Sequence, residues 1–447
     1  MKGIFRRISF IFLYIEVFAK RHTNLLLSSF IIGFFTTLLL FKFYPYFKNI
    51  LFPDNKVIGL VGQYGIDNLP LFIQNQLSLG LTSVNPDGSP SPGIASSWEA
   101  TGSGKVYIFH LKTHLLWHDG KILSSADIKY NLKDAEDSPI DDLTLRIDLK
   151  EPFSPLPVVL SRPLFRNNLT GLGQYRISDL KFKGDILSTL SLAPLINNQP
   201  SIEYKFYPTL DDAILAFKMG EVNTLWQIPN KDPFLSWTNV KITEITLHDR
   251  FIGLFYNTRS DLLKDKETRQ GLSFALPAFD DMERLFTPIS PSSWAYYNKV
   301  RIYKSDPENA KKIIEKTPLS SSSAQLTIST YALYLPIAQK VADKWNSIGI
   351  KTKVKVETAF PDDYQTILIA QEIPVDPDQY QFWHSKSEDT NISHYSNLKI
   401  DKLLEDGRRE LDQEKRKKSY VDFQRYLVDD APVSFLFFPK VYTIERK

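Results

Sequence analysis

The chain has 447 residues, about three times the length of a typical single domain, so we expect at least two lobes. Its 54 Lys and Arg residues nearly balance 51 Asp and Glu residues, and this composition gives no reason to expect a nucleic-acid partner. Cysteine is absent, which excludes disulfides, thiolate metal sites, a cysteine nucleophile and a lipid-modified cysteine as a membrane anchor.

The first 47 residues predict a membrane anchor made of peptide. Residues 24–41 carry no charge and have about the length that crosses ~30 Å of hydrocarbon, so we expect a transmembrane helix within 23–47. Five basic residues precede this stretch: Lys2, Arg6, Arg7, Lys20 and Arg21. Their position predicts a cytoplasmic segment 1–22 and a main domain outside the cytoplasmic membrane. A cleaved secretion signal is the alternative, but no small-x-small cleavage pattern follows.

Beyond the anchor, the pattern changes to short β-rich runs and capped helices. Aromatic and aliphatic residues alternate with polar ones over 107–111, which is typical of a half-buried strand. Asp119-Gly120 predicts a tight hairpin turn. Ser124 and Thr209 each stand before an acidic first turn, so each is expected to cap the start of a helix.

Three later segments, 307–316, 336–348 and 398–427, have helical periodicity. Within 336–348 the apolar side chains share one face, and along 398–427 many charged residues occupy the face opposite the apolar one. Strands and helices thus alternate irregularly, which predicts a mixed α/β (α+β) fold and not a repeat array.

Two local patterns suggest chemistry that we do not expect. His110, His114 and His118 are four residues apart, but on a strand such spacing separates neighbours by about 13 Å, too far for one shared metal ion. Residues 102–105, GSGK, lack the first glycine and the final Ser or Thr of a phosphate-binding loop, so we interpret them as a hairpin turn. No HExxH or GxSxG motif is present, and we predict no catalytic residues, no metal site and no cofactor.

Several longer blocks then occur in a fixed order from about residue 57 to the C-terminus. They are PGIASSWEA (92–100), YIFHLK (107–112), WHDGKILSSADIKY (117–130), LDDAILAFKMGEVNTL (210–225), LFYNTR (254–259), ETRQGLSFAL (267–276), DPENAKKIIEK (306–316), DPDQYQFWHS (376–385), NISHYSNLKIDKLL (391–404) and APVSFLFF (431–438). In this order the blocks resemble the extracytoplasmic solute-binding protein family 5, the peptide- and nickel-binding proteins of ABC importers, here as a membrane-anchored variant.

The resemblance implies a two-lobed fold like that of the type II periplasmic binding proteins. Lobe I is expected over 56–247, with a trimmed subdomain at about 85–165, and is completed by 436–447. Lobe II is expected over 248–435. In such a fold an extended ligand is enclosed as the two lobes close about crossing strands.

The resemblance also implies ligand contacts from lobe II and the crossing strands. An extended peptide needs hydrogen-bonding groups, a partner for its amine and flat apolar walls. Asp376 or Asp378 is expected to bind the amine, and aromatic residues are expected to line side-chain pockets. The full set of expected ligand-binding residues is Asn257, Trp294, Ala295, Tyr296, Asp376, Asp378, Tyr380, Trp383 and His384.

The sequence departs from the family pattern in three places. Peptide binders of the family carry an amine-binding aspartate where this chain has Ile373. Either Glu372 or Asp376 replaces that group, or the ligand lacks a free amine. The stretches 131–142 and 275–288 are also short, and the chain ends at Lys447 soon after the strand expected to return to lobe I, as in a truncated or degenerate paralogue.

These patterns predict a monomeric protein that captures peptides or peptide-like solutes outside the cytoplasmic membrane and delivers them to ABC permease subunits. Its expected contact with the membrane is the single N-terminal helix. The alternative is a tethered ligand sensor or interaction protein that kept the fold and lost transport, and Ile373 motivates this alternative.

Overall fold

The computed structural model describes four ranges of the chain: 21–24, 28–39, 55–196 and 199–447. Residues 28–39 are helical and expose large apolar side chains, among them Phe30 and Ile32. Every helix within the described ranges is too short or too polar to span a bilayer. Parts of the expected N-terminal segment and span lie outside the described residues: 1–20, 25–27 and 40–47.

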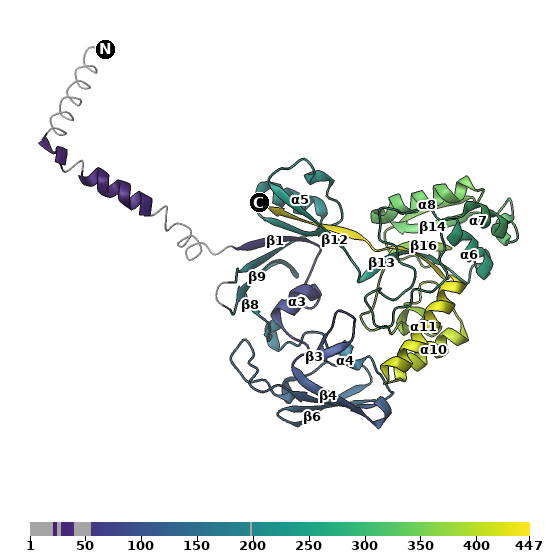
Figure 1. Ribbon diagram of the computed structural model, residues 1–447, viewed down its shortest axis with the longest axis horizontal. Helices are drawn as coiled ribbons and strands as arrows, with labels where there is room; N and C mark the ends of the chain where they lie inside the picture. Colours follow the sequence, from purple (N-terminus) through teal and green to yellow (C-terminus); the bar gives the residue numbers. More distant parts are fainter. Residues whose placement is uncertain (1–20, 25–27, 40–54, 197–198) are drawn as a thin grey trace, which may run out of the picture.

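Lobe I is built on a seven-stranded sheet (Figure 1). Its middle strand, β1 (Lys56–Val61), pairs in parallel with β10 (Ile202–Tyr207) and β11 (Thr224–Ile228). The other strands pair antiparallel and are β8 (Tyr175–Lys183), β9 (Ile186–Pro194), β12 (Val240–Thr246) and β18 (Lys440–Arg446). Because β18 lies between β11 and β12, residues from both ends of the described chain share one sheet.

Two helices pack on this sheet, α3 (Leu71–Leu77) and α5 (Leu210–Met219). The prediction of a capped helix after Thr209 is confirmed, because the Thr209 hydroxyl accepts a bond from the Asp212 N–H at 3.2 Å. Gly220 ends α5 in the left-handed region, with φ of 82°, where glycine avoids the strain of a side chain.

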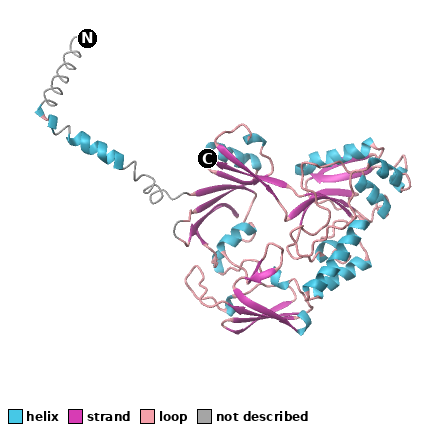
Figure 2. Cartoon of the chain, viewed as in Figure 1, coloured by secondary structure: helices cyan, strands magenta, loops and turns pink. Residues whose placement is uncertain are grey.

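The subdomain of lobe I contains a separate four-stranded sheet (Figure 2). Its strands, in spatial order, are β4 (Ala95–Thr101), β5 (Val106–Leu111), β7 (Thr144–Leu149) and β6 (Ala135–Asp141). The predicted alternation along β5 is confirmed, since Tyr107, Phe109 and Leu111 are buried and His110 is exposed.

The turn at Gly120 is also confirmed, while the helix expected after Ser124 is wrong. Trp117 donates to the Lys121 carbonyl at 2.9 Å, and Gly120 has φ of 82°. Ser124 does form a capping box with Asp127, but only one 3₁₀ turn follows, η2 (Ser125–Asp127), before the backbone becomes extended. Residues 128–134, between this turn and β6, form no helix.

Lobe II has a five-stranded sheet with helices on both faces (Figures 1 and 2). The strands, in spatial order, are β15 (Thr352–Glu357), β14 (Leu326–Tyr331), β16 (Thr366–Glu372), β13 (Arg250–Tyr256) and β17 (Val433–Phe437). Helices α6 (Lys266–Phe274), α7 (Pro307–Ile314) and α8 (Leu335–Ser347) cover one face, and α10 (Leu398–Arg409) and α11 (Gln413–Asp430) cover the other. Strand β13 serves both cores, because Ile252 and Leu254 face the first group of helices while Phe251 and Phe255 face the second.

The helices predicted over 307–316 and 336–348 are present as α7 and α8, within two residues of the expected ends. The single helix expected over 398–427 is wrong, because α10 ends at Arg409 and α11 begins at Gln413. Asp412 caps α11 by accepting a bond from the Lys415 N–H at 2.9 Å. The polar pattern continues through 410–412, so it did not predict the break between the two helices.

Shorter elements complete the described fold. They are β2 (Thr82–Val84), β3 (Pro90–Pro92), α4 (Leu156–Val159), α9 (Tyr380–Trp383), and the 3₁₀ turns η1 (Gly102–Gly104), η3 (Asn167–Leu169), η4 (Asp232–Phe234), η5 (Pro318–Ser320) and η6 (Ala332–Tyr334).

Two short segments cross between the lobes. One joins β12 to β13 and the other joins β17 to β18, and Figure 1 shows them side by side. Leu247 of the first donates to the Pro439 carbonyl of the second at 2.9 Å. His248 packs edge-on against Phe438 with ring centroids 4.8 Å apart, and its Nε2 lies 3.0 Å from the Glu283 carboxylate. The crossing is thus a paired connection of the kind about which two lobes hinge.

Candidate functional site

Asp376, an expected amine-binding residue, lies buried in the loop after β16. The residue is 6% exposed, and its carboxylate is held by Arg416 of α11, with Nη2 2.7 Å from Oδ1 and Nη1 3.2 Å from Oδ2. Burial raises the pKa of the Asp376 carboxyl, and Arg416 acts in the opposite direction. Both carboxylate oxygens are engaged within lobe II, and burial leaves little of the group exposed to a ligand amine.

Asp378 is paired in the same way with a second arginine. Arg408 of α10 donates to Asp378 Oδ2 through Nη2 at 2.7 Å and Nε at 2.9 Å. The same guanidinium lies 4.0 Å from the ring centroid of Tyr380, which stacks on the His384 ring at 4.0 Å. His384 is buried, with Nε2 3.3 Å from Glu405. Asp378, Tyr380 and His384 therefore lie together around Arg408.

Trp294, Ala295 and Tyr296 lie beside the first of these arginines. The Trp294 ring packs edge-on against Tyr420 at 6.2 Å, and the Arg416 guanidinium lies 5.3 Å from its centroid. Ala295 is fully buried, whereas Trp294 and Tyr296 are half-buried. Of these three residues, the two aromatic side chains retain exposed surface.

Trp383 lies in the core of lobe II. It is 1% exposed, stacks on Phe255 with centroids 6.2 Å apart, and its Nε1 donates to Gln379 at 3.3 Å. Its indole therefore fills the space between β13 and α9. A wall for a ligand side chain would need an exposed ring face at this position, and Trp383 has none.

Asn257 does not lie with the other predicted residues. It follows β13, which pairs antiparallel with β16 so that Arg250 faces Glu372 at one end and Tyr256 faces Thr366 at the other. Six steps of about 3.4 Å separate these ends, roughly 20 Å. Asn257 thus lies at the end of the lobe II sheet away from the crossing segments, where it donates to the Tyr364 carbonyl at 2.8 Å.

Ile373 and Glu372 differ sharply in exposure. Ile373 is 7% exposed and packs in the core with Phe251 and Trp383, so its side chain faces away from solvent. Glu372 is exposed at the last position of β16, opposite Arg250 at the start of β13. Among the carboxylates of residues 372–378, Glu372 is therefore the exposed one at the end of lobe II next to the crossing segments.

The lobes also touch away from the crossing, through the subdomain. Trp294 donates from its backbone N–H to the Asp87 carbonyl at 2.9 Å, and Ser154 donates to the Arg408 carbonyl at 2.8 Å. The Phe153 ring lies 5.3 Å from the Arg408 guanidinium. We call these residues the interlobe contact. Arg408 thus links the Asp378 loop to the subdomain.

Tyr107 of the subdomain lies behind this contact. Burial raises its pKa to about 12. Of the lobe II residues, Arg416 lowers this pKa and Asp376 raises it, each by less than burial does. Its hydroxyl donates to the Phe153 carbonyl at 3.1 Å. The Asp376–Arg416 pair of lobe II therefore lies close enough to the subdomain to influence the pKa of Tyr107.

The sequence interpretation missed Arg408 and Arg416. A signal for them was present, because two carboxylates in one aromatic-rich loop, Asp376 and Asp378, require cationic partners if they are buried. Neither arginine stands near that loop in the sequence, so the pairing depends on how α10 and α11 pack on the sheet. Within the described ranges, no group of three or more His, Asp or Glu side chains could hold a metal ion.

Two lobes that are joined by paired crossing segments and touch again through a subdomain form the architecture of two-lobed binding proteins. The profile described as "Bacterial extracellular solute-binding proteins, family 5 Middle" matches residues 89–177 and 196–393. The chain belongs to the family of bacterial extracellular solute-binding proteins, family 5.

Curated relatives match most of the chain. The oligopeptide-binding protein AppA of Bacillus subtilis is 22% identical over 470 residues, with 86% of each chain covered. The dipeptide-binding protein of Escherichia coli is 22% identical over 476 residues, with the same coverage.

Solved structures share the fold. CtaP of Listeria monocytogenes superposes with a TM-score of 0.73 at 20% identity, and NikZ of Campylobacter jejuni in complex with Ni(L-His) with 0.71 at 22%. The nonapeptide complex of AppA from Bacillus subtilis superposes with 0.68 at 19% identity. Each covers 88% of this chain and 94% of its own. The expected two-lobed mixed α/β fold is confirmed by these likenesses.

Proposed function

We propose that the protein captures a peptide or peptide-like solute between its two lobes and delivers it to an ABC permease. The observation that carries this proposal is the match to peptide-binding relatives over 86% of the chain, together with lobes that contact each other at both ends of their facing surfaces. The expected residues Trp294 and Tyr296 are half-buried near the interlobe contact, where aromatic rings suit peptide side chains, whereas the Tyr380 ring is held between Arg408 and His384.

Glu372 is the group that we propose for the ligand amine. Asp376 and Asp378 are each bound to an arginine, and Ile373 is buried, whereas Glu372 is exposed at the crossing end of β16. A charge-assisted bond between an ammonium group and a carboxylate contributes about 1.5–3 kcal/mol, which is roughly 10- to 100-fold in affinity.

The test is a thermal titration of the full chain in detergent with a panel of peptides two to nine residues long. Binding peptides are expected to raise the melting temperature, because a ligand at about 100 times its Kd stabilises the folded state by ~2.7 kcal/mol. Glu372→Gln should weaken binding of free peptides and remove their advantage over N-acetylated ones. Glu136→Gln, an exposed position on β6, is the matched control and should change neither.

The absence of any shift across the panel would overturn the proposed function. A shift that survives Glu372→Gln unchanged, with free and acetylated peptides still distinguished, would overturn only the role of Glu372. The two outcomes are separable because the first concerns every peptide and the second concerns the amine alone.

The proposal includes a membrane tether formed by a helix within 23–47. The uncharged run 24–41 supports it, as does the helix over 28–39 with its exposed apolar side chains. The full chain is expected to stay with membranes during alkaline carbonate extraction, while a chain lacking 24–41 is released. Release of the full chain by carbonate would contradict the tether.

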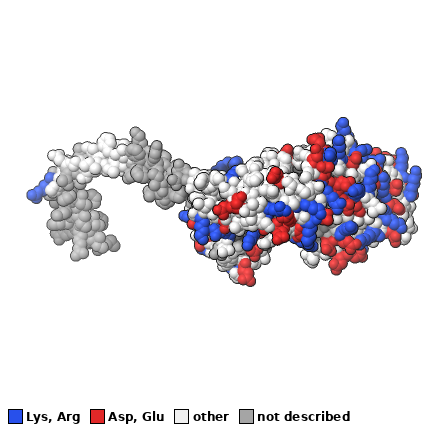
Figure 3. Space-filling view, turned by 90° about the horizontal axis from the view of Figure 1, so that it is seen from below, with Lys and Arg blue, Asp and Glu red and all other residues white. Residues whose placement is uncertain are grey.

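Figure 3 shows Lys and Arg side chains mixed with Asp and Glu side chains on one face of the molecule. A face of this kind presents no field of a single sign, and such mixed charge favours solubility over attraction to a polyanion. The charges visible on this face therefore give no support for a nucleic-acid partner.

A further inference from the structure

The C-terminal end of α10 lies at the interlobe contact. The last four carbonyl groups of an α-helix have no partner within the helix, so each needs a donor from elsewhere. Ser154 of the subdomain donates its N–H to the Arg408 carbonyl at 2.8 Å. Its hydroxyl oxygen lies 3.0 Å from the Arg408 carbonyl oxygen and 3.3 Å from that of Gly407. A helix of lobe II is thus capped by a residue of lobe I.

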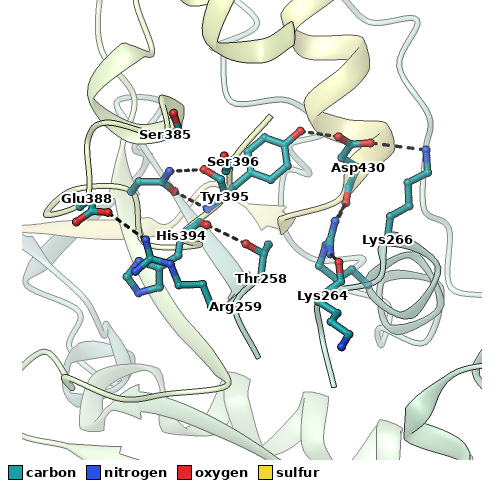
Figure 4. A pocket seen from close by; sticks show the side chains of 12 residues that line it. Thr258, Arg259, Lys264, Lys266, Ser385, Glu388, His394, Tyr395, Ser396 and Asp430 are labelled. Atoms are coloured by element: carbon teal, nitrogen blue, oxygen red, sulfur yellow. Dashed lines mark hydrogen bonds and ion pairs between the residues drawn. The ribbon is translucent and has the colours of Figure 1, made fainter. Parts of the chain in front are cut away.

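The neighbouring helix α11 is capped inside its own lobe. Figure 4 shows its end, where Lys266 and Tyr395 point at the Asp430 carboxylate. Arg269 of α6 donates to the Asp430 carbonyl through Nη2 at 2.7 Å. These groups all belong to lobe II, so the cap of α11 does not depend on how the lobes are arranged. The cap that Ser154 provides for α10, in contrast, requires that the lobes touch.

Arg408 connects this cap to the expected ligand-binding residues. Its side chain donates to the Asp378 carboxylate through Nε and Nη2, at 2.9 and 2.7 Å. The guanidinium lies 4.0 Å from the ring centroid of Tyr380 and 5.3 Å from that of Phe153, which precedes Ser154 in the chain. The residue whose carbonyl is capped by the subdomain therefore also holds the Asp378 loop.

A second point of contact lies at the turn between β2 and β3. The Asp87 carbonyl accepts a hydrogen bond from the Trp294 N–H at 2.9 Å. At Gly88, φ is 84°, and a Cβ atom would lie 2.7 Å from the Val375 carbonyl oxygen, closer than a side chain permits. Only glycine therefore allows the subdomain to approach lobe II here, one residue before Asp376.

The contact is narrow and is reached by water. Val375 is 54% exposed, and Leu411, which lies beside Gly104 of the subdomain, is 43% exposed. A hollow of about 550 Å³ adjoins Leu411, between Ser103 of the subdomain and Arg409 of lobe II. Water can replace the few interlobe hydrogen bonds, so each contributes only a modest net stabilisation, and the contact can open and close.

We propose that the interlobe contact is a latch that favours the closed arrangement of the lobes by itself, with Ser154 as its positioning residue. The proposal rests on the proposed function, because the latch closes the proposed peptide site. A protein that binds only in its closed form has an apparent Kd equal to the intrinsic Kd divided by the closed fraction. Weakening the latch is therefore expected to weaken the binding of every solute by one common factor, without changing selectivity.

The test is the distribution of distances between two spin labels on the full chain in detergent, measured without peptide. Because the chain has no cysteine, labels attach only at Glu136→Cys on β6 and Lys312→Cys on α7, both exposed positions. Ser154→Asp removes the hydroxyl donor and places a negative charge at the negative end of α10. It should lower the ratio of closed to open molecules about 10-fold, equivalent to ~1.4 kcal/mol, which is comparable to one hydrogen bond.

Ser97→Asp, at an exposed position on β4, is the matched control, because it adds the same charge to the same subdomain. It should leave the distance distribution unchanged. Ser154→Ala, which keeps the N–H donor, should give a closed fraction between those of the wild type and Ser154→Asp. Far-ultraviolet circular dichroism checks that each variant is folded.

Peptide titrations supply a second readout. For Ser154→Asp, the Kd of each peptide should rise by the ratio of the two closed fractions, for free and N-acetylated peptides alike. Identical distances in the wild type and both folded Ser154 variants would overturn the latch, as would a weakening that differs between peptides. If no peptide binds, the proposed function falls, while the distances still decide whether the latch exists.

Discussion

Replacing Arg416 with methionine is expected to lower the free energy of unfolding of the full chain by about 3–5 kcal/mol, because removing one member of a buried ion pair leaves an uncompensated charge. Arg416 and Asp376 are each 8% exposed in their side chains and are joined by two hydrogen bonds. Chemical denaturation followed by far-ultraviolet circular dichroism measures the change. Arg416→Met is the sharpest test of whether Asp376 is a structural group.

The control for this prediction is Arg425→Met on the same helix. Arg425 also pairs with an aspartate, Asp422, but both side chains are about half exposed, and its loss should cost less than about 1 kcal/mol. Changing both buried partners, with Asp376→Leu added to Arg416→Met, should recover part of the loss, since no charge then stays buried. If Arg416→Met unfolds no more easily than Arg425→Met, the pair contributes nothing and Asp376 is free to serve a ligand.

Replacing Trp383 with alanine is expected to cost about 3–5 kcal/mol, the usual loss when a large aromatic side chain is removed from a core. The indole is 1% exposed, stacks on Phe255 and bonds Gln379, so its removal leaves a cavity between β13 and α9. The measurement is again denaturation of the full chain. Trp383→Phe should recover most of the stability because it retains an aromatic ring at the same place.

Trp294→Ala provides the comparison for Trp383. Trp294 is half-buried at the interlobe contact, so its removal should cost less stability and should weaken peptide binding in the folded protein. The opposite pattern, in which Trp383→Ala stays fully stable and loses peptide binding, would show that Trp383 faces a ligand. The pair of variants thus separates a core tryptophan from one on the facing surface of lobe II.

Features that depend on neighbouring residues could be predicted from the sequence. Alternation identified β5, and side-chain capping identified the start of α5 after Thr209, because each depends on residues within a few positions of one another. Ser124 shows the limit of this reasoning. It forms the expected capping box, but the backbone becomes extended at Ile128 and no helix continues, which the capping pattern does not reveal.

The site was harder to predict because its partners are far apart in the sequence. Asp376 and Arg416 are distant along the chain and meet only because the loop after β16 and helix α11 pack on the same face of the lobe II sheet. Asn257 lies apart from the other predicted ligand-binding residues for a related reason. Family blocks predict which residues follow a strand, while the antiparallel register of β13 and β16 decides at which end of the sheet they lie.

Strand β18 has a consequence for the order in which the chain can fold. Lobe II contains strands from β13 to β17, so all of its sheet is synthesised before β18. Lobe I begins earlier, with Lys56, but β11 and β12 lack the strand between them until Lys440–Arg446 has been synthesised. During synthesis the first lobe therefore waits with unpaired strand edges while the second is completed, and such edges are the surfaces that a chaperone or an export partner must shield.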